Sequence, residues 1–293
     1  MSKVNVAGVL FVLVAAISWS TAGLFTRVVT TDIPTTLFWR SLFGGLFVLG
    51  IAMAMQQKPV DINAVFRFQR GETVIASLST AGMICFISAF FFTTIANVAF
   101  VYGTMPLVTF ALSLVFLGIR ADYLSLGCCL VSAAGVAVMV SGNSLPNDFA
   151  GILLAFGMTL FMASLTVAAK FFPDADSTKA TYFSAFMGAV VTAPFATFGN
   201  TIPADYLWLF LYGAVNVGMG FGVYLVGVKK VSALVAALVG LTEIPLAPFW
   251  AWALFGERVN LPVLLGGAMI LFAAVVYITS SSRTVAGGDT KEA

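Results

Sequence analysis

The chain has 293 residues, of which 60% are hydrophobic and only 9% are charged, and its formal net charge is +2. Soluble domains carry roughly a quarter charged residues, so this composition calls for a lipid bilayer as solvent. The small net charge argues against nucleic acid as a partner, and the absence of histidine excludes histidine-dependent catalysis. The cysteines Cys85, Cys128 and Cys129 lie in apolar runs without metal-ligand spacing, so neither a metal nor a cofactor is expected.

Ten apolar runs of about 20 residues follow one another, bounded by charges, prolines or polar clusters. Each predicts a membrane-spanning helix, because a helix satisfies its own backbone hydrogen bonds in lipid. The predicted spans, numbered in chain order, are 5–26, 35–55, 72–94, 97–118, 122–141, 149–170, 178–198, 204–227, 231–254 and 260–281. The fold class is therefore an all-α integral membrane protein.

The basic residues predict the orientation of the spans. With the N-terminus in the cytoplasm, the outer segments hold only Arg27 and Arg258. The inner segments hold eleven basic residues: Lys3, Lys58, Arg67, Arg70, Arg120, Lys170, Lys179, Lys229, Lys230, Arg283 and Lys291. This asymmetry follows the positive-inside rule, so both termini are expected on the cytoplasmic side of a bacterial-type inner membrane.

The two halves of the chain resemble each other at a spacing near 140 residues. The run AGVL at 7–10 recurs as AGIL at 150–153, and MPL at 105–107 matches IPL at 244–246. This counterpart in mid-chain argues against a cleaved signal peptide at the N-terminus. Five spans is an odd number, so the second copy must enter the membrane inverted, which is typical of transporters with a central cavity. The expected domains are a first repeat at 1–145, a second at 146–283 and a flexible cytoplasmic tail at 284–293.

A family resemblance rests on the second copy. It has a glutamate and two prolines within EIPLAPF at 243–249, then FGER at 255–258 and a glycine pair at 266–267. This pattern resembles the EamA-type repeat of the drug/metabolite transporter superfamily, in which the amino-acid exporters of the YddG type and the threonine/homoserine exporters are nearest in kind. The resemblance implies ten spans in two inverted five-helix repeats, with a central cavity open to one side at a time. The first copy departs from the pattern, since Thr104 stands where Glu243 does.

Glu243 is the sharpest functional candidate. It lies near the middle of the ninth span, where an ionised carboxylate costs at least about 2.5–3.5 kcal/mol. Pro245 and Pro248 follow it and weaken the local helix. One interpretation is a cavity-facing carboxylate that contacts a substrate amine or takes a proton; the other is a protonated or paired glutamate that bridges the weakened backbone. The other acidic residues lie in loops or at span ends, so Glu243 is the only deep candidate for proton coupling.

Arg40 allows two interpretations as well. It lies about one and a half turns into the second span, so its long stem could carry the charge to the membrane interface. The alternative is a contact with an anion, for instance a substrate carboxylate.

Uncharged polar and aromatic residues also lie at depth. Asn97 and Asn216 would be unfavourable against lipid, so they should face protein or a cavity. Individual serines often bond their own helix, and tryptophans often lie at the membrane interface, which is the interpretation adopted for Trp39, Trp250 and Trp252. The predicted cavity-lining residues are Trp19, Ser20, Asn97, Tyr102, Asn216, Tyr224 and Glu243.

Glycines and a proline are candidates for a hinge. Gly218 and Gly220 in the eighth span permit close packing or bending, and Pro245 loosens the ninth. The segment 56–71 is expected to rest on anionic lipid at the cytoplasmic face.

The functional hypothesis is a secondary transporter that exports small organic metabolites, most of all amino acids including aromatic or hydrophobic ones, by alternating access. Export of drug-like cations, nucleosides or sugars stays open, as do a non-transport intramembrane enzyme and a scaffold. An enzyme is disfavoured because no pair of aspartates lies at membrane depth and no acidic cluster would hold a metal-phosphate substrate. Small-molecule substrate and membrane lipid are the expected partners. Proton coupling and the choice between monomer and homodimer stay open.

Overall fold

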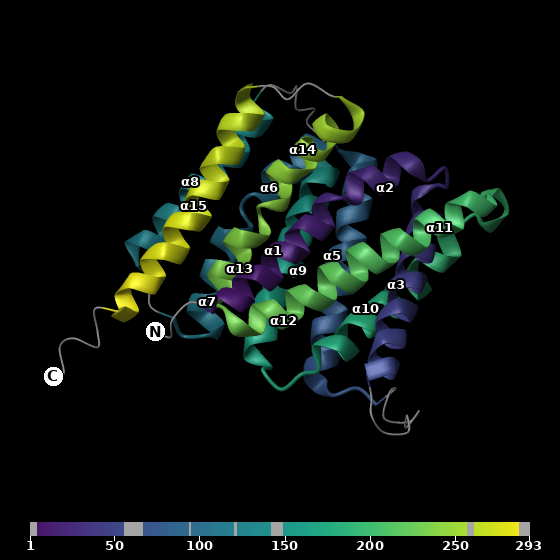
Figure 1. Cartoon of the computed structure of the whole chain (residues 1–293), viewed down its shortest axis with the longest axis horizontal. Coiled ribbons are helices and arrows are strands. Elements are labelled where there is room, and N and C mark those ends of the chain that lie inside the picture. Colours follow the sequence, from purple (N-terminus) through teal and green to yellow (C-terminus); the bar gives the residue numbers. More distant parts are fainter. Residues whose placement is uncertain are drawn as a thin grey trace.

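The computed structural model describes residues 5–55, 67–93, 95–119, 122–141, 149–256 and 261–286, and every regular element within them is a helix (Figure 1). The first half contains α1 (Val6–Ser20), α2 (Ala22–Val28), α3 (Ile33–Met55), α5 (Arg70–Phe92), α6 (Ile95–Tyr102), α7 (Met105–Phe116) and α8 (Tyr123–Val140). The second half contains α9 (Phe149–Phe171), α10 (Ser177–Thr192), α11 (Pro203–Tyr212), α12 (Val223–Lys230), α13 (Ala233–Gly240), α14 (Glu243–Phe255) and α15 (Leu261–Ala286).

Six helical segments in the described part are long and apolar enough to cross a membrane. They are Val6–Phe25, Ile33–Ala54, Phe149–Phe171, Pro203–Lys230, Ala233–Leu254 and Leu261–Ser280. They coincide with predicted spans one, two, six, eight, nine and ten. The other predicted spans are helical too, in α5, in α6 with α7, in α8 and in α10.

Two predicted boundaries were wrong. Span seven was expected to reach residue 198, but α10 ends at Thr192 and a short 3₁₀ turn, Ala193–Phe195, follows. Pro194 explains the stop, since it has no N–H to bond to the preceding turn. The last helix was expected to end near 281, yet α15 continues to Ala286, past the predicted start of the tail at 284. Residues 287–293 lie outside the described part.

Four of the spans are interrupted. Thr21 separates α1 from α2, Gly103 and Thr104 separate α6 from α7, and Leu241 and Thr242 separate α13 from α14. Between α11 and α12 the chain forms a π-helix, η3 (Gly213–Gly222), whose wider turns interrupt the α-helical hydrogen bonding. Such interruptions are tolerated at membrane depth where neighbouring helices and side chains take up the freed backbone groups.

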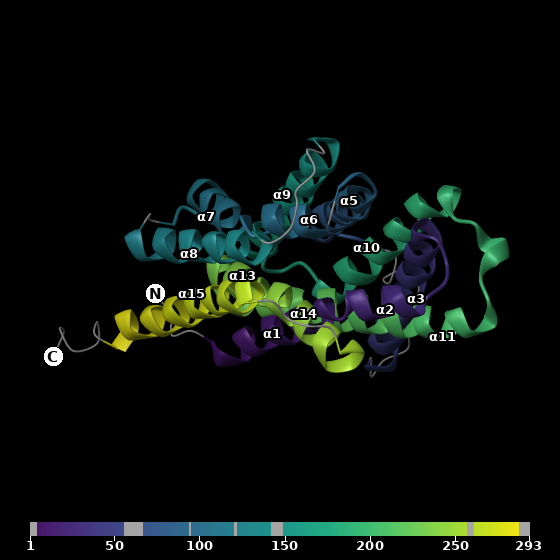
Figure 2. The same cartoon turned by 90° about the horizontal axis from the view of Figure 1, so that it is seen from above.

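The helices pack in two layers (Figure 2). Helices α5 to α9 form one layer and α1, α2, α14 and α15 form the other, with α3 and α10 side by side at one edge. The layers join where α8 packs on α15 and where α13 packs on α7 and α9. Many large apolar side chains remain exposed on the outside, for example Val115, Leu264 and Phe272. A surface of this kind fits contact with lipid and not with water.

Candidate substrate site at the break between α13 and α14

The candidate site lies where the ninth span is broken. The hydroxyl of Thr242 donates to the carbonyl of Val239 (2.7 Å), which closes the end of α13, and Glu243 then begins α14. Pro245 cannot donate a hydrogen bond, so the first turn of α14 cannot continue the helix before it. The position places the Glu243 carboxyl at a helix N-terminus, where the helix dipole favours negative charge.

Three of the predicted site residues meet at this break. The carboxyl of Glu243 is a side-chain hydrogen-bond partner of the Tyr102 hydroxyl, and the Tyr224 hydroxyl lies near enough to interact with its charge. Tyr102 is the last residue of α6 and Tyr224 lies in α12, so three separate spans contribute. Both tyrosines are buried, whereas Glu243 is half-buried. The carboxyl is therefore bonded to one phenol and lies near a second, and it is not sealed off completely.

The hydrogen bonds of Thr166 indicate which phenol serves the carboxyl. The Thr166 hydroxyl donates to the carbonyl of Met162 (2.9 Å) and also contacts the Tyr224 hydroxyl (2.6 Å). A hydroxyl has one proton to donate, so Tyr224 must be the donor to Thr166. Tyr102 is then the phenol that is free to donate to Glu243.

Three more of the predicted site residues lie where span one packs on span eight, beside this cluster: Trp19, Ser20 and Asn216. The Trp19 indole donates to the carbonyl of Asn216 (3.1 Å), and its ring lies 5.0 Å from the Tyr224 ring. The Asn216 amide donates to the carbonyl of Ser18 (3.0 Å), which lies at the end of α1 where the break at Thr21 interrupts the helix. Asn216 thus repairs a helix break. As predicted, it faces protein and not lipid.

Tryptophan 250 differs from its interfacial interpretation. It is half-buried, and its indole N–H donates to the Ser20 hydroxyl (2.9 Å), which links span nine to span one. Ser20 in turn donates to the carbonyl of Ile17 (2.7 Å). Sequence reasoning missed Trp250 and Thr166 as neighbours of the site, and no local pattern marks either residue.

The hinge candidates take packing positions. A Cβ atom on Gly220 would lie 2.3 Å from the Trp19 indole nitrogen, and one on Gly218 would lie 2.8 Å from the Phe47 ring. Both glycines therefore permit close contacts between η3 and its neighbours. Pro245 packs against Gly267 of α15, where an added Cβ would lie 2.9 Å away. Asn97 is part of α6, and its side chain lies outside the described part.

Arg40 is enclosed by the bundle and is not exposed on its surface. Its side chain is only 6% exposed, with the guanidinium 4.9 Å from the centre of the Tyr212 ring. Tyr212 of α11 and Met83 of α5 enclose the charged group inside the bundle, which favours the interpretation in which Arg40 faces the interior.

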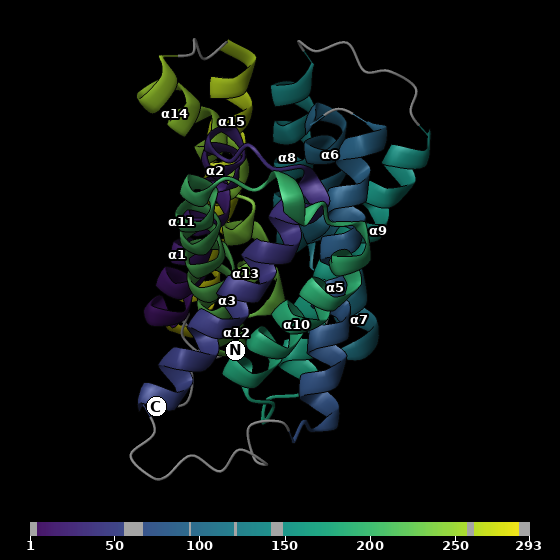
Figure 3. The same ribbon diagram turned by 90° about the vertical axis from the view of Figure 1, so that its right-hand side faces the viewer.

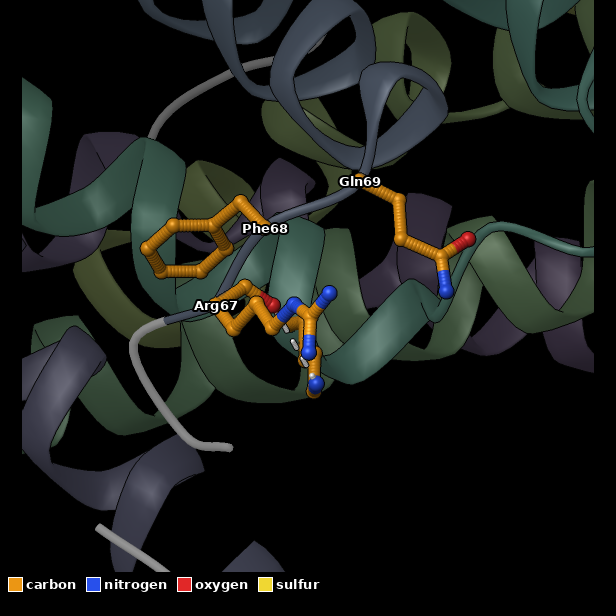
Figure 4. Close-up of a pocket in the computed structure, with 4 residues that line it drawn as sticks. Arg67, Phe68 and Gln69 are labelled. Atoms are coloured by element: carbon orange, nitrogen blue, oxygen red, sulfur yellow. Dashed lines mark hydrogen bonds between the residues drawn. The ribbon is translucent and has the colours of Figure 1, made fainter. Parts of the chain in front are cut away.

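Two surface pockets lie away from this cluster. One, of about 410 Å³, is lined by Arg67, Phe68, Gln69 and Lys179, and the Lys179 ammonium there donates to the Arg67 carbonyl at 3.5 Å (Figure 4). The other, of about 510 Å³, is an apolar groove between the fourth and sixth spans, lined by Val101, Thr104, Val108, Phe149, Ile152, Leu153 and Phe156. Neither pocket includes Glu243, so the predicted cavity around that residue stays a prediction.

The fold and the helix-break site together define a polytopic helical membrane protein with a polar cluster at depth. The chain belongs to the EamA-like transporter family, whose profile matches residues 6–141 and again residues 149–279. It is therefore a membrane transporter.

Relatives agree with that assignment. An uncharacterized transporter of Archaeoglobus fulgidus is 26% identical over 273 residues, which cover 90% of this chain and 94% of the relative. An uncharacterized transporter of Synechocystis sp. is 27% identical over 267 residues, which cover 82% of this chain and 75% of the relative. A solved crystal structure of a protein superposes with a TM-score of 0.80 at 18% identity, covering 95% of this chain and 98% of that one. This last likeness supports the fold alone.

Proposed function

We propose that this protein is a secondary transporter that exports small amphiphilic amines, amino acids foremost, by alternating access across a bacterial-type inner membrane. The observation that carries the proposal is the contact between the Glu243 carboxyl and the Tyr102 hydroxyl at a broken helix inside the bundle. A carboxylate at membrane depth is costly unless it is paired or serves a substrate or proton. Among the described residues its neighbours are phenols and not fixed cations, so a cationic amine or a proton would complete it.

The aromatic side chains beside Glu243 suit an amphiphilic solute. Trp19 packs against both Phe221 and Tyr224 with ring centres 5.0 Å apart. Such rings favour apolar or aromatic groups of a ligand, and they also attract cations through their faces. We expect the predicted cavity to lie between this aromatic wall and Tyr102.

The packing pattern supports two inverted repeats as the basis of alternation. If spans one to five are exchanged with spans six to ten, α5 in span three corresponds to η3 and α12 in span eight, and α9 in span six corresponds to α1 in span one. The contact of α5 with α9 therefore corresponds to the contact of η3 and α12 with α1, which is also present. The contact of α3 with η3 becomes that of α10 with α5, while the pairs α8–α15 and α3–α10 map onto themselves. The two family matches, at 6–141 and 149–279, divide the chain at the same place.

Two buried acids at opposite ends of the bundle fit the same exchange. Glu72, in the first turn of α5, accepts from the backbone N–H of Asp176 (3.3 Å), just before α10. Asp205, in the first turn of α11, accepts from the backbone N–H and the hydroxyl of Thr30 (3.1 and 2.8 Å), just before α3. Each contact joins the two halves at one end. In an alternating carrier, opening at one end would release one contact and keep the other.

Orientation with the N-terminus in the cytoplasm is part of the proposal. Helices α3, α5 and α12 reach one end of the bundle and α2, α6 and α14 reach the other (Figure 3). The first of these ends carries the described basic residues Arg67, Arg70, Lys170, Lys179, Lys229 and Lys230. The positive-inside rule assigns that end to the cytoplasm. Gly218, Gly220 and Pro245 are proposed to let spans eight and nine bend during the cycle.

The test is flux in proteoliposomes loaded with labelled amino acids, organic cations, nucleosides or sugars, with and without an imposed pH difference. We expect the wild-type protein to transport amines. The Glu243→Gln variant should transport them roughly 100-fold more slowly, which is the factor for losing a charge-assisted contact of about 3 kcal/mol. Asp174→Asn is the control, because it also neutralises a carboxyl, but an exposed one that lies outside the contacts assigned to substrate binding and to alternation. Flux of no solute, or equal flux in the two variants, would refute the proposal.

A further inference from the structure

Arg40 is a buried cation that the described residues leave almost without acceptors. A guanidinium has five N–H donors. One of them, on Nη2, reaches the thioether sulfur of Met83 at 3.2 Å, and Nε has no hydrogen-bond partner. A thioether is a weak acceptor, and none of the described residues forms an ion pair with this arginine.

The depth of Arg40 makes this arrangement costly. It lies seven residues after the first residue of α3, roughly 10 Å along the helix at 1.5 Å per residue. Its side chain is 6% exposed and Nε is buried, so water does not reach Nε to replace the missing acceptor. Buried charges are stable when they are paired and hydrogen-bonded, and an unpaired one costs several kcal/mol.

The surrounding helices hold the guanidinium in place. A Cβ atom on Gly213 would lie 2.5 Å from the Arg40 carbonyl, so α3 and η3 approach each other as closely as glycine permits at this turn. Tyr212, the residue before Gly213, presents its ring to Arg40, and Phe25 stacks on Tyr212 at 5.0 Å. The Tyr212 ring orients the guanidinium but does not accept the N–H groups that lie in the guanidinium plane. The N–H groups at the edge of the guanidinium therefore stay available to another acceptor.

From this geometry we infer that Arg40 is a carboxylate-binding site between α3, α5 and α11. The planar fork of arginine matches a carboxylate with two parallel hydrogen bonds, and Nε is one of the donors that such a pair uses. The carboxylate comes either from the transported solute, in which case Arg40 sets substrate specificity, or from a free anion. The first source rests on the proposed transport function, and the second does not.

Binding is tested first on the purified full chain in detergent. Sodium formate is exchanged for sodium gluconate at constant sodium, and the thermal unfolding midpoint is measured. For a chain of this size, formate at ten times its Kd is expected to raise the midpoint by about 2 °C, with saturation. Arg40→Met should abolish this rise, Arg40→Lys should weaken it, and Arg70→Met, which removes an exposed arginine at the start of α5, should retain it.

Flux distinguishes the two sources of the carboxylate. Phenylalanine and leucine are compared with phenylalaninamide and leucinamide, which keep the amine and lose the acid. If the solute supplies the carboxylate, the acids are favoured by about tenfold or more, and Arg40→Met reduces that preference to within about twofold. A formate effect that depends on Arg40, without any preference for the acids, identifies a free anion.

The inference fails if wild-type protein shows neither a saturable formate shift nor a preference for the acids, or if both survive in Arg40→Met. Wild-type measurements suffice for the first outcome, so the inference stays testable if Arg40→Met does not fold. Absence of any flux would refute the transport proposal, while the formate measurement would still decide the role of Arg40.

Discussion

The breaks in spans four and nine contain the same type of hydrogen bond from a threonine hydroxyl to a backbone carbonyl, but they differ in their other side chains. In the first break, the Thr104 hydroxyl donates to the carbonyl three residues earlier, Val101, at 2.7 Å. In the second, the Thr242 hydroxyl donates to the carbonyl three residues earlier, Val239, also at 2.7 Å. These equal hydrogen bonds make Thr104 the structural counterpart of Thr242 and not of Glu243.

The comparison locates Glu243 as an additional residue. One residue separates Thr104 from Pro106, and two separate Thr242 from Pro245. Alignment on the prolines therefore placed Thr104 opposite Glu243, although the hydrogen bonds pair the two threonines. A helix break alone needs a threonine and a proline, as the first half demonstrates. The carboxyl in the second half is therefore not required to make the break, which favours a functional role for it.

The largest expected effect comes from moving the carboxyl from the break in span nine to the break in span four. In the variant Glu243→Thr with Thr104→Glu, the carboxyl moves to residue 104, which lines the apolar groove between the fourth and sixth spans. We expect amine flux to stay about 100-fold below wild type, because a contact of about 3 kcal/mol is lost and not rebuilt. Proteoliposome flux measures this, and recovery to near wild-type flux would contradict the asymmetry of the two breaks.

Next in size are the two tyrosines, one from each half. Tyr102→Phe removes the donor to Glu243 and should lower amine flux by roughly tenfold and change its pH dependence, since a hydrogen bond to a charged group is lost. Tyr224→Phe removes a donor to Thr166 and should lower flux by less than about threefold. Initial rates across a pH series compare the two variants. A larger effect of Tyr224→Phe would reverse the assignment of the donor.

The glycines at the breaks should affect stability and not transport chemistry. A Cβ atom on Gly103 would lie 2.5–2.9 Å from the Val136 side chain, whereas nothing lies within 4 Å of one on Gly240. Gly103→Ala is expected to cost about 1–3 kcal/mol through overpacking, and Gly240→Ala to be neutral or slightly stabilising. Thermal unfolding in detergent decides this, and equal midpoints would mean that the contact with Val136 relaxes freely.

The smallest expected effect tests the equivalence of the two threonines. Thr104→Val and Thr242→Val each remove one hydroxyl bond to a backbone carbonyl, worth about 0.5–1.5 kcal/mol. If the two residues are counterparts, the losses of stability should agree within about 0.5 kcal/mol. Unfolding of both variants under one set of conditions provides the comparison. A clear excess for either variant would mean that its break depends more strongly on the hydroxyl.

Composition and charge by themselves determined the class of this protein. Long apolar runs have few physical solutions in lipid, so the helical architecture and most span positions could be predicted. Glu243 could be predicted as a site residue for the same reason, because a carboxyl in the middle of such a run is costly in lipid. Tyr102 and Tyr224 were also predicted as site residues, and both lie beside Glu243.

Only the tertiary structure decided which polar groups meet. Trp19 and Asn216 are 197 residues apart in the chain, and Thr166 and Tyr224 are 58 apart. In a chain whose helices are apolar on nearly every side, no polar face reveals which side packs inward. From the sequence, the Arg40 side chain could point either to the interface or into the bundle, because both directions are stereochemically allowed. Its direction follows from the close approach of α3 to η3 at Gly213, which depends on how the helices pack.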